Sequence, residues 1–104
     1  MTEADIRNRL RRRLGEAFGA RLRKIVLYGS RVRGDAPAYS DLDVVVVLKG
    51  PVRFGEDLHA AVKALYPLQL DADFPIHPLP VDEHSYEAGD FALYRNVQRE
   101  GVVL

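Results

Sequence analysis

Two aspartates enter a strongly apolar segment in the first half of the chain. Ser40-Asp41-Leu42-Asp43 leads directly into four consecutive valines. Side chains of a β-strand alternate between the two faces of a sheet, so Asp41 and Asp43 would share one face, about 7 Å apart. Like charges this close raise each other's pKa unless a cation lies between them. Mg²⁺ takes oxygen ligands and keeps positions open for substrate phosphates, so the pattern predicts a magnesium site.

A glycine-serine pair, Gly29-Ser30, follows another short apolar segment, and ten residues separate it from the aspartates. Glycine needs no side-chain room, so backbone amides can approach an anion there. If residues 30–33 begin a helical turn, their N–H groups favour a phosphate. The hydroxyl of Ser30 and the charges of Arg31 and Arg33 would strengthen that binding. We therefore predict that a metal-bound triphosphate fills the gap between this corner and the two carboxylates.

Each half of this pattern is weak evidence by itself. An exposed strand start can hold Asp-x-Asp without any function, and a glycine-serine pair after a strand is commoner still. The two together, at this spacing and leading into a buried strand, favour a functional site.

The bulk composition narrows the class of protein. A chain of 104 residues is expected to form a single domain, residues 1–104, and 47% apolar with 29% charged residues is typical of a globular protein. No apolar run approaches the roughly 20 residues of a membrane helix, and no signal peptide is evident, so we expect a cytoplasmic protein without a membrane partner. The absence of cysteine excludes disulfides and thiolate sites.

The elements that must position these residues can be read from the spacing of apolar residues. Ile6, Leu10, Leu14 and Phe18 predict an N-terminal helix capped by Thr2. Strands are predicted at 25–28 and 41–48, with a loop at 35–39 between them. A helix is predicted from Glu56 that stops before Pro67, followed by an extended segment over 70–81. The last helix is predicted to begin at Asp82 or Glu83, to be interrupted near Gly89 and to end at Gly101. Three prolines in 70–81 indicate an edge or interrupted strand, which leaves self-association or hetero-association open. This order predicts an α/β (α+β) domain with a mixed sheet.

Charge is divided unevenly along the chain. Residues 1–34 hold 10 Lys and Arg against 3 Asp and Glu, whereas residues 35–104 hold 5 against 12. This division suggests a positive surface beside a negative one. The arginines from Arg7 to Arg13 lie mostly off the apolar stripe and would face water or a partner. Aromatic residues are not interleaved with them, which disfavours nucleic acid.

The two motifs resemble those of the minimal nucleotidyltransferases of the DNA polymerase beta superfamily. The family pattern is Gly-Ser-Arg-Ala-Arg-Gly, a short loop, and Ser-Asp-x-Asp-hydrophobic. This chain has Gly29-Ser30-Arg31-Val32-Arg33-Gly34 and Ser40-Asp41-Leu42-Asp43-Val44, in which Val32 alone departs. Arg99 to Leu104 is similar to the family's final helix and strand. The resemblance implies a small polymerase-beta-like domain, a mixed sheet with helices packed mainly on one face.

The resemblance also implies an activity. Such enzymes transfer a nucleoside monophosphate from a nucleoside triphosphate, here expected to be ATP, to a hydroxyl and release pyrophosphate. Gly29 and Ser30, with Arg31 and Arg33, would bind the nucleotide, and Asp41 and Asp43 would bind two Mg²⁺ ions, or Mn²⁺ in their place. Relatives of this size are commonly antitoxins encoded beside an all-helical HEPN ribonuclease, and some adenylylate that toxin. The implied partner is a HEPN-type toxin, and the implied acceptor is a protein hydroxyl.

Active family members carry a third carboxylate on the next strand. We predict that Asp73 fills this catalytic and metal-binding role, with Asp71 and His77 as alternatives. Asp73 and His77 share strand parity if Pro75 leaves the strand regular. Histidine titrates near neutrality, so His77 could serve as a base. If none of these residues serves, the chain binds nucleotide without transfer.

Two other functions compete with this one. A catalytically weak antitoxin would neutralise its partner by forming a complex, through the Arg7–Arg13 face or the proline-rich strand. A transferase for small molecules is disfavoured, because such relatives usually add an acceptor-binding domain that 104 residues cannot contain.

Overall fold

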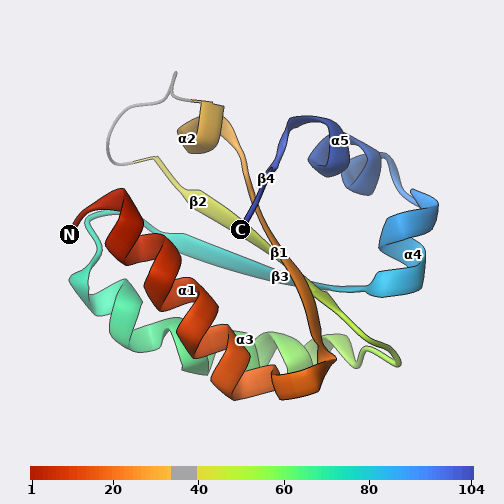
Figure 1. Cartoon of the computed structure of the whole chain (residues 1–104), viewed down its shortest axis with the longest axis horizontal. Helices are drawn as coiled ribbons and strands as arrows, with labels where there is room; N and C mark the ends of the chain where they lie inside the picture. Colours follow the sequence, from red (N-terminus) through yellow and green to blue (C-terminus); the bar gives the residue numbers. More distant parts are fainter. Residues whose placement is uncertain (34–39) are drawn as a thin grey trace.

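A computed structural model describes residues 1–33 and 40–104, apart from the side chains of Ser30 and Arg33. The predicted loop at 35–39 and Gly34 lie outside the described residues. The elements in chain order are α1 (Glu3–Phe18), the 3₁₀ helix η1 (Gly19–Arg21), β1 (Leu22–Tyr28), α2 (Ser30–Arg33), β2 (Leu42–Leu48), α3 (Phe54–Asp71), β3 (Ile76–Asp82), α4 (Glu83–Ala88), α5 (Ala92–Glu100) and β4 (Val102–Val103). The N-terminus and the α4–α5 pair lie at opposite ends of the molecule (Figure 1).

The strands form a mixed sheet in the order β3-β2-β1-β4. β1 runs antiparallel to both β2 and β4, whereas β2 and β3 are parallel and are connected by α3. The valine-rich β2 is an inner strand with almost every residue buried, as its continuous apolar sequence requires. The predicted α+β fold with a mixed sheet is confirmed.

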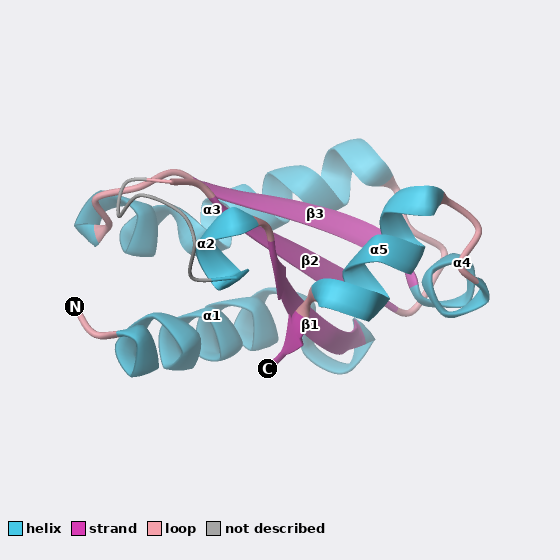
Figure 2. Ribbon diagram, turned by 90° about the horizontal axis from the view of Figure 1, so that it is seen from above, coloured by secondary structure: helices cyan, strands magenta, loops and turns pink. Residues whose placement is uncertain are grey.

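Helices cover the two faces of the sheet unequally (Figure 2). One face packs against α1 and α3, and its core contains the even-numbered residues of β2, from Leu42 to Leu48. The other face has a smaller core, where Val45 and Val47 meet Tyr86 of α4 and Val97 of α5. Asp43 shares its parity with Val45, so it belongs to this second, less covered face, as predicted.

Helix α1 has the predicted start and the predicted buried stripe. Thr2 accepts a hydrogen bond from the backbone N–H of Asp5, and the Asp5 side chain accepts one from the N–H of Thr2. This capping box satisfies two N–H groups that the helix leaves unpaired. The buried residues are Ile6, Leu10, Leu14 and Phe18.

Helix α3 is longer than the sequence predicts. It starts at Phe54 rather than Glu56 and passes through Pro67 to Asp71, so the predictions of a stop before Pro67 and of an extended chain from Leu70 were wrong. Proline inside a helix costs about 3 kcal/mol. Leu65 and Leu68, on either side of Pro67, are buried against the sheet and α1, and their burial offsets that cost.

Two arginines of α1 bind α3 instead of facing water. Arg13 donates to the carbonyl of Ala64 at 2.9 Å, and Arg9 donates to the carboxylate of Asp71 at 2.9 Å. The expectation that Arg13 faces water or a partner is therefore wrong. Arg13 supports the helical turn that precedes Pro67.

The predicted edge strand is confirmed in β3, which lies at one side of the sheet. The N–H of Ile76 points away from β2 and donates to the side chain of Gln69 at 2.7 Å. Since backbone N–H groups alternate along a strand, Pro78 and Pro80 occupy the next two outward positions and carry no N–H. The outer edge of β3 therefore lacks the donors that another strand would need.

The C-terminal segment follows the predicted interruption. Gly89 ends α4 in the left-handed conformation, with φ +66°, and α5 begins three residues later. The closing strand β4 pairs with Val26 and Leu27 of β1. Among the described residues, no helix has the length and apolar character needed to cross a membrane.

Candidate active site

A glycine corner and an aspartate meet where β1 ends. Gly29 has φ +110°, which L side chains rarely adopt, and its carbonyl accepts a hydrogen bond from the N–H of Val32 in α2. A Cβ atom placed on Gly29 would lie 2.8 Å from Oδ2 of Asp43. The carboxylate of Asp43 therefore lies directly against the corner, in space that only glycine leaves open.

The register of three strands surrounds Asp43 with specific neighbours. Tyr28 of β1 and His77 of β3 are its partners on the two sides. Asp41 lies just before β2, and its Oδ2 is 3.0 Å from Nε2 of His77. An ionised carboxylate can only accept, so Nε2 of His77 carries the hydrogen in this contact. Asp43 thus lies beside the glycine corner, and His77 and Asp41 lie on the β3 side of Asp43.

The surroundings of Asp43 shift the pKa of its carboxyl group upward. Burial raises the pKa of Asp43, the nearby His77 counteracts this by lowering the pKa, and the charge of Asp41 raises it further. A raised pKa means that the ionised form of Asp43 is disfavoured in the protein without a ligand. A cation between Asp41 and Asp43 would favour the ionised form of both.

The donor set fits a hard divalent cation that also binds substrate. Mg²⁺ is commonly held by one or two carboxylates, with water and substrate phosphates completing its shell. In the described part of the chain, no group of three or more His, Asp or Glu side chains is arranged to hold a metal ion. Asp41 and Asp43 would therefore provide the protein ligands, and phosphate oxygens would provide others.

The structure does not bring the predicted third carboxylate to this pair. β3 begins at Ile76, after Pro75, so the strand parity expected for Asp73 does not apply. Asp73 is exposed and lines a hollow of about 310 Å³ with Met1, Glu3 and Arg31. Asp71 ends α3 and pairs with Arg9. The strand position beside Asp43 belongs to His77, and a metal-binding role for Asp73 stays a prediction.

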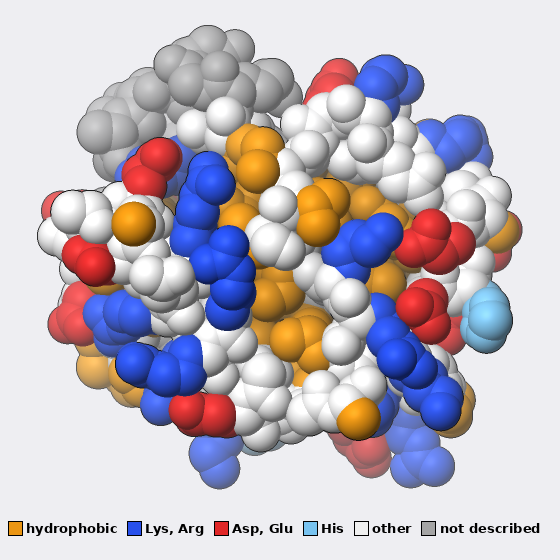
Figure 3. All heavy atoms as spheres, viewed as in Figure 1, with side chains coloured by type: hydrophobic (Ala, Val, Ile, Leu, Met, Phe, Trp, Pro, Cys, Tyr) orange, Lys and Arg blue, Asp and Glu red, His pale blue; other side chains and the backbone are white. Residues whose placement is uncertain are grey.

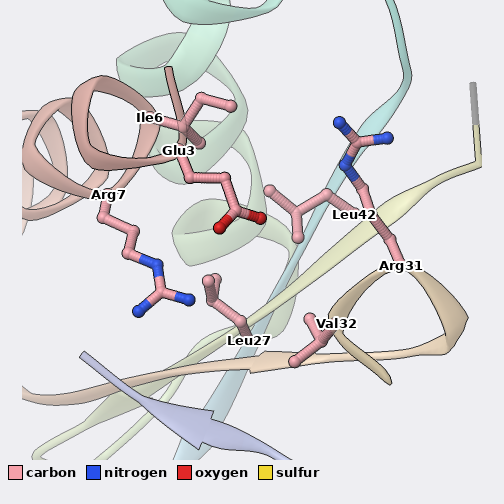
Figure 4. A pocket seen from close by; sticks show the side chains of 7 residues that line it. All are labelled: Glu3, Ile6, Arg7, Leu27, Arg31, Val32 and Leu42. Atoms are coloured by element: carbon pink, nitrogen blue, oxygen red, sulfur yellow. The ribbon is translucent and has the colours of Figure 1, made fainter. Parts of the chain in front are cut away.

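The motif arginine Arg31 extends toward the α1 side of the sheet. Its guanidinium lies 3.6 Å from the ring centroid of Phe74, a cation–π contact. Figure 4 shows Arg31 and Arg7 on opposite sides of a hollow of about 110 Å³, with Glu3 between them. The contact between Arg31 and Phe74 fixes α2 to the segment before β3. Nucleotide binding by Arg31 stays a prediction, and the side chains of Ser30 and Arg33 lie outside the described part.

Sequence reasoning missed two residues near the site. Tyr28 precedes Gly29 and pairs with Asp43 across the sheet, and its place at the end of a strand before the glycine was the available signal. Phe74 stacks on Arg31, and no local pattern marks it, because the contact joins segments 43 residues apart in the chain.

Comparison with known proteins identifies the same family as the sequence motifs. The family model for the nucleotidyltransferase domain matches residues 7–94. The chain is 32% identical over 92 residues to a protein of Methanocaldococcus jannaschii named "Putative protein adenylyltransferase MJ0604", covering 88% of this chain and 86% of that protein.

Two solved structures share the fold. A crystal structure of a toxin-antitoxin with AMP-PNP aligns with a TM-score of 0.60 at 20% identity, covering 99% of this chain and 72% of that one. A "putative nucleotidyltransferase" from Sulfolobus solfataricus aligns with a TM-score of 0.58 at 18% identity, covering 99% and 87%.

Proposed function

This chain belongs to the nucleotidyltransferase domain family, and on that premise we propose that it transfers AMP from ATP to a hydroxyl group of a partner protein. The observation that carries the proposal is the contact of the Gly29 corner with Asp43, whose neighbour on β3, His77, also contacts Asp41. Phosphate-binding backbone and metal-binding carboxylates are both required for this reaction, and here they adjoin.

The carboxylates act as the anchor for the nucleotide's cation. Asp41 and Asp43 would hold Mg²⁺, as two ions in the full reaction, with Mn²⁺ as a substitute. A metal held by these two carboxylates would stabilise negative charge on the reacting phosphate and on the attacking and leaving oxygens. The acceptor oxygen forms a bond to the α-phosphorus, and the bond to the oxygen bridging the α- and β-phosphates breaks, so pyrophosphate leaves. The hydroxyl proton is released to solvent or to a neighbouring base.

The glycine corner positions the phosphates. Consecutive backbone N–H groups after Gly29 would provide the donors for an anion. Val32 packs into the core and Arg31 stacks on Phe74, which anchors α2. We assign the β- and γ-phosphates to Gly29 and Ser30.

His77 orients one of the acids. Its contact with Oδ2 of Asp41 leaves the other carboxylate oxygen available for the cation. Ligating carboxylates are commonly held in this way by a hydrogen bond from a neighbouring side chain.

The acceptor and partner are inferred from the relatives. The Methanocaldococcus jannaschii relative is named for adenylyl transfer to protein, and one structure of the same fold is a toxin-antitoxin with an ATP analogue. These names support a protein hydroxyl as acceptor, ATP as donor and a toxin as partner. That the toxin is of the HEPN type is implied by the motif resemblance alone.

A second candidate function has its own supporting observation. Among the described residues, no third carboxylate is placed to bind a metal together with Asp41 and Asp43. The strand position beside Asp43 is occupied by His77. A site with two carboxylates can bind a metal–nucleotide complex yet hold the second ion weakly. The alternative is an antitoxin that binds nucleotide and neutralises its partner by complex formation.

The test is label transfer from α-labelled ATP to the co-purified partner, with Mg²⁺ and with Mn²⁺. We expect labelling that Asp41→Asn or Asp43→Asn lowers by about 100-fold or more, while Glu56→Gln, an exposed carboxylate on α3, leaves it unchanged. The same assay on Asp73→Asn tests the third ligand. Partner binding without label in the wild type would favour the second candidate. Label that survives when Asp41→Asn and Asp43→Asn are combined in one chain would refute the assigned site.

A further inference from the structure

The chain between the end of α3 and the first residues of β3 connects two parts of the candidate site. This stretch, the 74–77 segment, runs from Phe74 to His77. The ring centroid of Phe74 lies 3.6 Å from the guanidinium of Arg31 in α2. At the other end, His77 donates to the carboxylate of Asp41 at 3.0 Å. The segment therefore joins the helix after the glycine corner to the aspartate pair.

The middle of the 74–77 segment is bonded to β2 inside the aspartate motif. The carbonyl of Pro75 accepts a hydrogen bond from the N–H of Leu42 at 2.9 Å, and Ile76 is the register partner of Leu42. Leu42 lies between Asp41 and Asp43 in the chain, and its side chain is buried. A shift of the segment would therefore disturb the backbone between the two acids.

One side chain of α3, that of Gln69, holds the 74–77 segment in place. Its Nε2 donates to the carbonyl of Phe74 at 2.9 Å, and its Oε1 accepts from the N–H of Ile76 at 2.7 Å. Since a backbone N–H can only donate and a carbonyl can only accept, these two contacts determine the orientation of the amide group. The backbone carbonyl of Gln69 also accepts from the N–H of Ala72. The same residue thus closes the helix and fixes the start of the strand.

The arrangement requires the last turn of α3 and a carboxamide of this length. A helix that stopped before Pro67 would not place Gln69 beside the segment. An ionised glutamate would accept from Ile76 but could not donate to Phe74, and asparagine is one methylene shorter. Methionine has a similar size and helix propensity but lacks the amide group. The substitution Gln69→Met therefore removes both bonds and keeps the helix.

We propose that Gln69 is a positioning residue for the reaction. By fixing the 74–77 segment, it holds His77 against one oxygen of Asp41, so that the other oxygen stays available for the cation. Gln69 acts only through the segment, since both bonds of its side chain go to backbone atoms. The inference rests on the function proposed above, because it assumes that Asp41 binds the metal.

Hydrogen exchange of single amides, measured by NMR without metal or nucleotide, tests whether Gln69 holds the segment. The N–H of Leu42 bonds to Pro75, which Gln69 does not touch, so it reports movement of the segment rather than loss of a direct bond. In Gln69→Met we expect the Leu42 amide to exchange about 10-fold faster. Val45, which pairs with β1, should exchange as in the wild type. An unchanged Leu42 amide would overturn the proposal, as would equal acceleration of Leu42 and Val45, which indicates general destabilisation.

A glutamine on α5 offers the matched control. The side-chain amide of Gln98 also donates to a backbone carbonyl, that of Tyr86, but Tyr86 belongs to the core on the other face of the sheet. Gln98→Met removes the same kind of bond and should leave the Leu42 amide and metal binding unchanged. An effect of Gln98→Met equal to that of Gln69→Met would overturn the proposal.

Binding of Mn²⁺ alone, followed by electron paramagnetic resonance, tests the consequence for the acids. Loss of a group that holds a metal ligand typically lowers metal affinity by 10- to 100-fold. Gln69 acts one step further away, so we expect the Kd for Mn²⁺ to rise about 10-fold in Gln69→Met. Label transfer to the partner should fall by a similar factor. A Leu42 amide that exchanges faster while the Kd for Mn²⁺ is unchanged would overturn the positioning role.

A double substitution separates this role from a general loss of structure. In a chain that already carries His77→Ala, Gln69→Met should change the Kd for Mn²⁺ by less than about twofold, because the route through His77 is gone. A full 10-fold effect in that background would overturn the proposal. A wild type that binds no Mn²⁺ would refute the metal site of the proposed function, and the role assigned to Gln69 with it. The exchange of the Leu42 amide distinguishes that outcome, because it is measured without metal.

Discussion

Asp43 is subject to two opposing requirements. The proposed cation site requires its ionised form, yet burial and the charge of Asp41 raise its pKa and disfavour that form. The nearby imidazole of His77 relieves only part of this cost. An ionised acid in such a position destabilises the protein without ligand, and the proposed cation would remove this cost.

This conflict predicts the effect of Asp43→Asn. The folded-state pKa of Asp43 is raised, so the ionised side chain reduces stability at neutral pH, and the neutral amide should raise the free energy of unfolding there. Nucleotidyl transfer should fall by about 100-fold or more. Urea unfolding at pH 7 and label transfer measure the two effects on the same samples. A variant less stable than the wild type would show that the Asp43 charge is compensated in the free protein.

Gly29 offers a separate test at the same corner. Gly29→Ala forces a Cβ into a conformation with φ +110° and to 2.8 Å from Oδ2 of Asp43. We expect a loss of about 1–3 kcal/mol in the free energy of unfolding, together with loss of ATP binding measured by calorimetry.

The control for this change lies in α1. Gly15 is inside the helix, and a Cβ there would have no heavy atom within 4 Å among its neighbours outside the helix. Gly15→Ala should stabilise the protein by about 0.5–1 kcal/mol and leave ATP binding intact. Equal effects of the two substitutions would contradict the assignment of the corner.

At the scale of elements, α3 is held by charged anchors as well as by its core. Asp57 is 7% exposed, and both of its oxygens accept from Arg21 at 3.0 Å. Arg21 also donates to the carbonyls of Lys49 and Pro51. These bonds join η1, the loop after β2 and the first turn of α3. They fix the crossover that sets the register of β3, and therefore the place of His77.

This anchor predicts a pH-dependent stability. The hydrogen bonds from Arg21 hold the pKa of Asp57 below its usual value. The unfolded chain then binds the proton more readily, so the stabilisation is complete above the unfolded-state pKa of about 3.9 and is lost as the pH falls through the lower folded-state pKa. Asp57→Asn should cost about 2–3 kcal/mol at pH 7, measured by urea unfolding. A deficit of the same size at pH 3 would contradict this account.

The same elements show what the sequence alone could predict. The alternation of β2, which puts Leu42, Val44, Val46 and Leu48 on the face covered by α1 and α3, follows from local pattern and was confirmed. The passage of α3 through Pro67 could not be predicted, because it depends on contacts with distant residues such as Arg13. The pairing of His77 with Asp43 could not be predicted either, because the register of β3 on β2 depends on the length and path of the whole connection through α3. Motif spacing therefore located the Asp41–Asp43 pair better than it located its neighbours on other strands.

Over the whole molecule, folding brings basic residues of the first third of the chain against acidic residues of the remainder. On the face in Figure 3, Lys and Arg gather over α1, and apolar side chains lie at the centre. Among the described residues, basic residues of the first third pair with acids of the remainder in Arg9–Asp71, Arg21–Asp57, Arg23–Glu83 and Lys24–Glu87. The division of charge thus joins the two parts of one domain, although it also leaves a basic surface on α1.

Ligand binding should stabilise this domain as a unit. If Asp41 and Asp43 hold the cation of ATP, Mg²⁺ with ATP at 100 times its Kd adds about 2.7 kcal/mol to the free energy of unfolding. For a domain of this size that is a rise in Tm of roughly 10–20 °C. Thermal unfolding should show this rise with Mg²⁺ and ATP together, little of it with ATP in EDTA, and none in Asp41→Asn. A rise that is equal with and without the metal would place the nucleotide away from the acids, because binding at this corner requires a cation between carboxylates and phosphates.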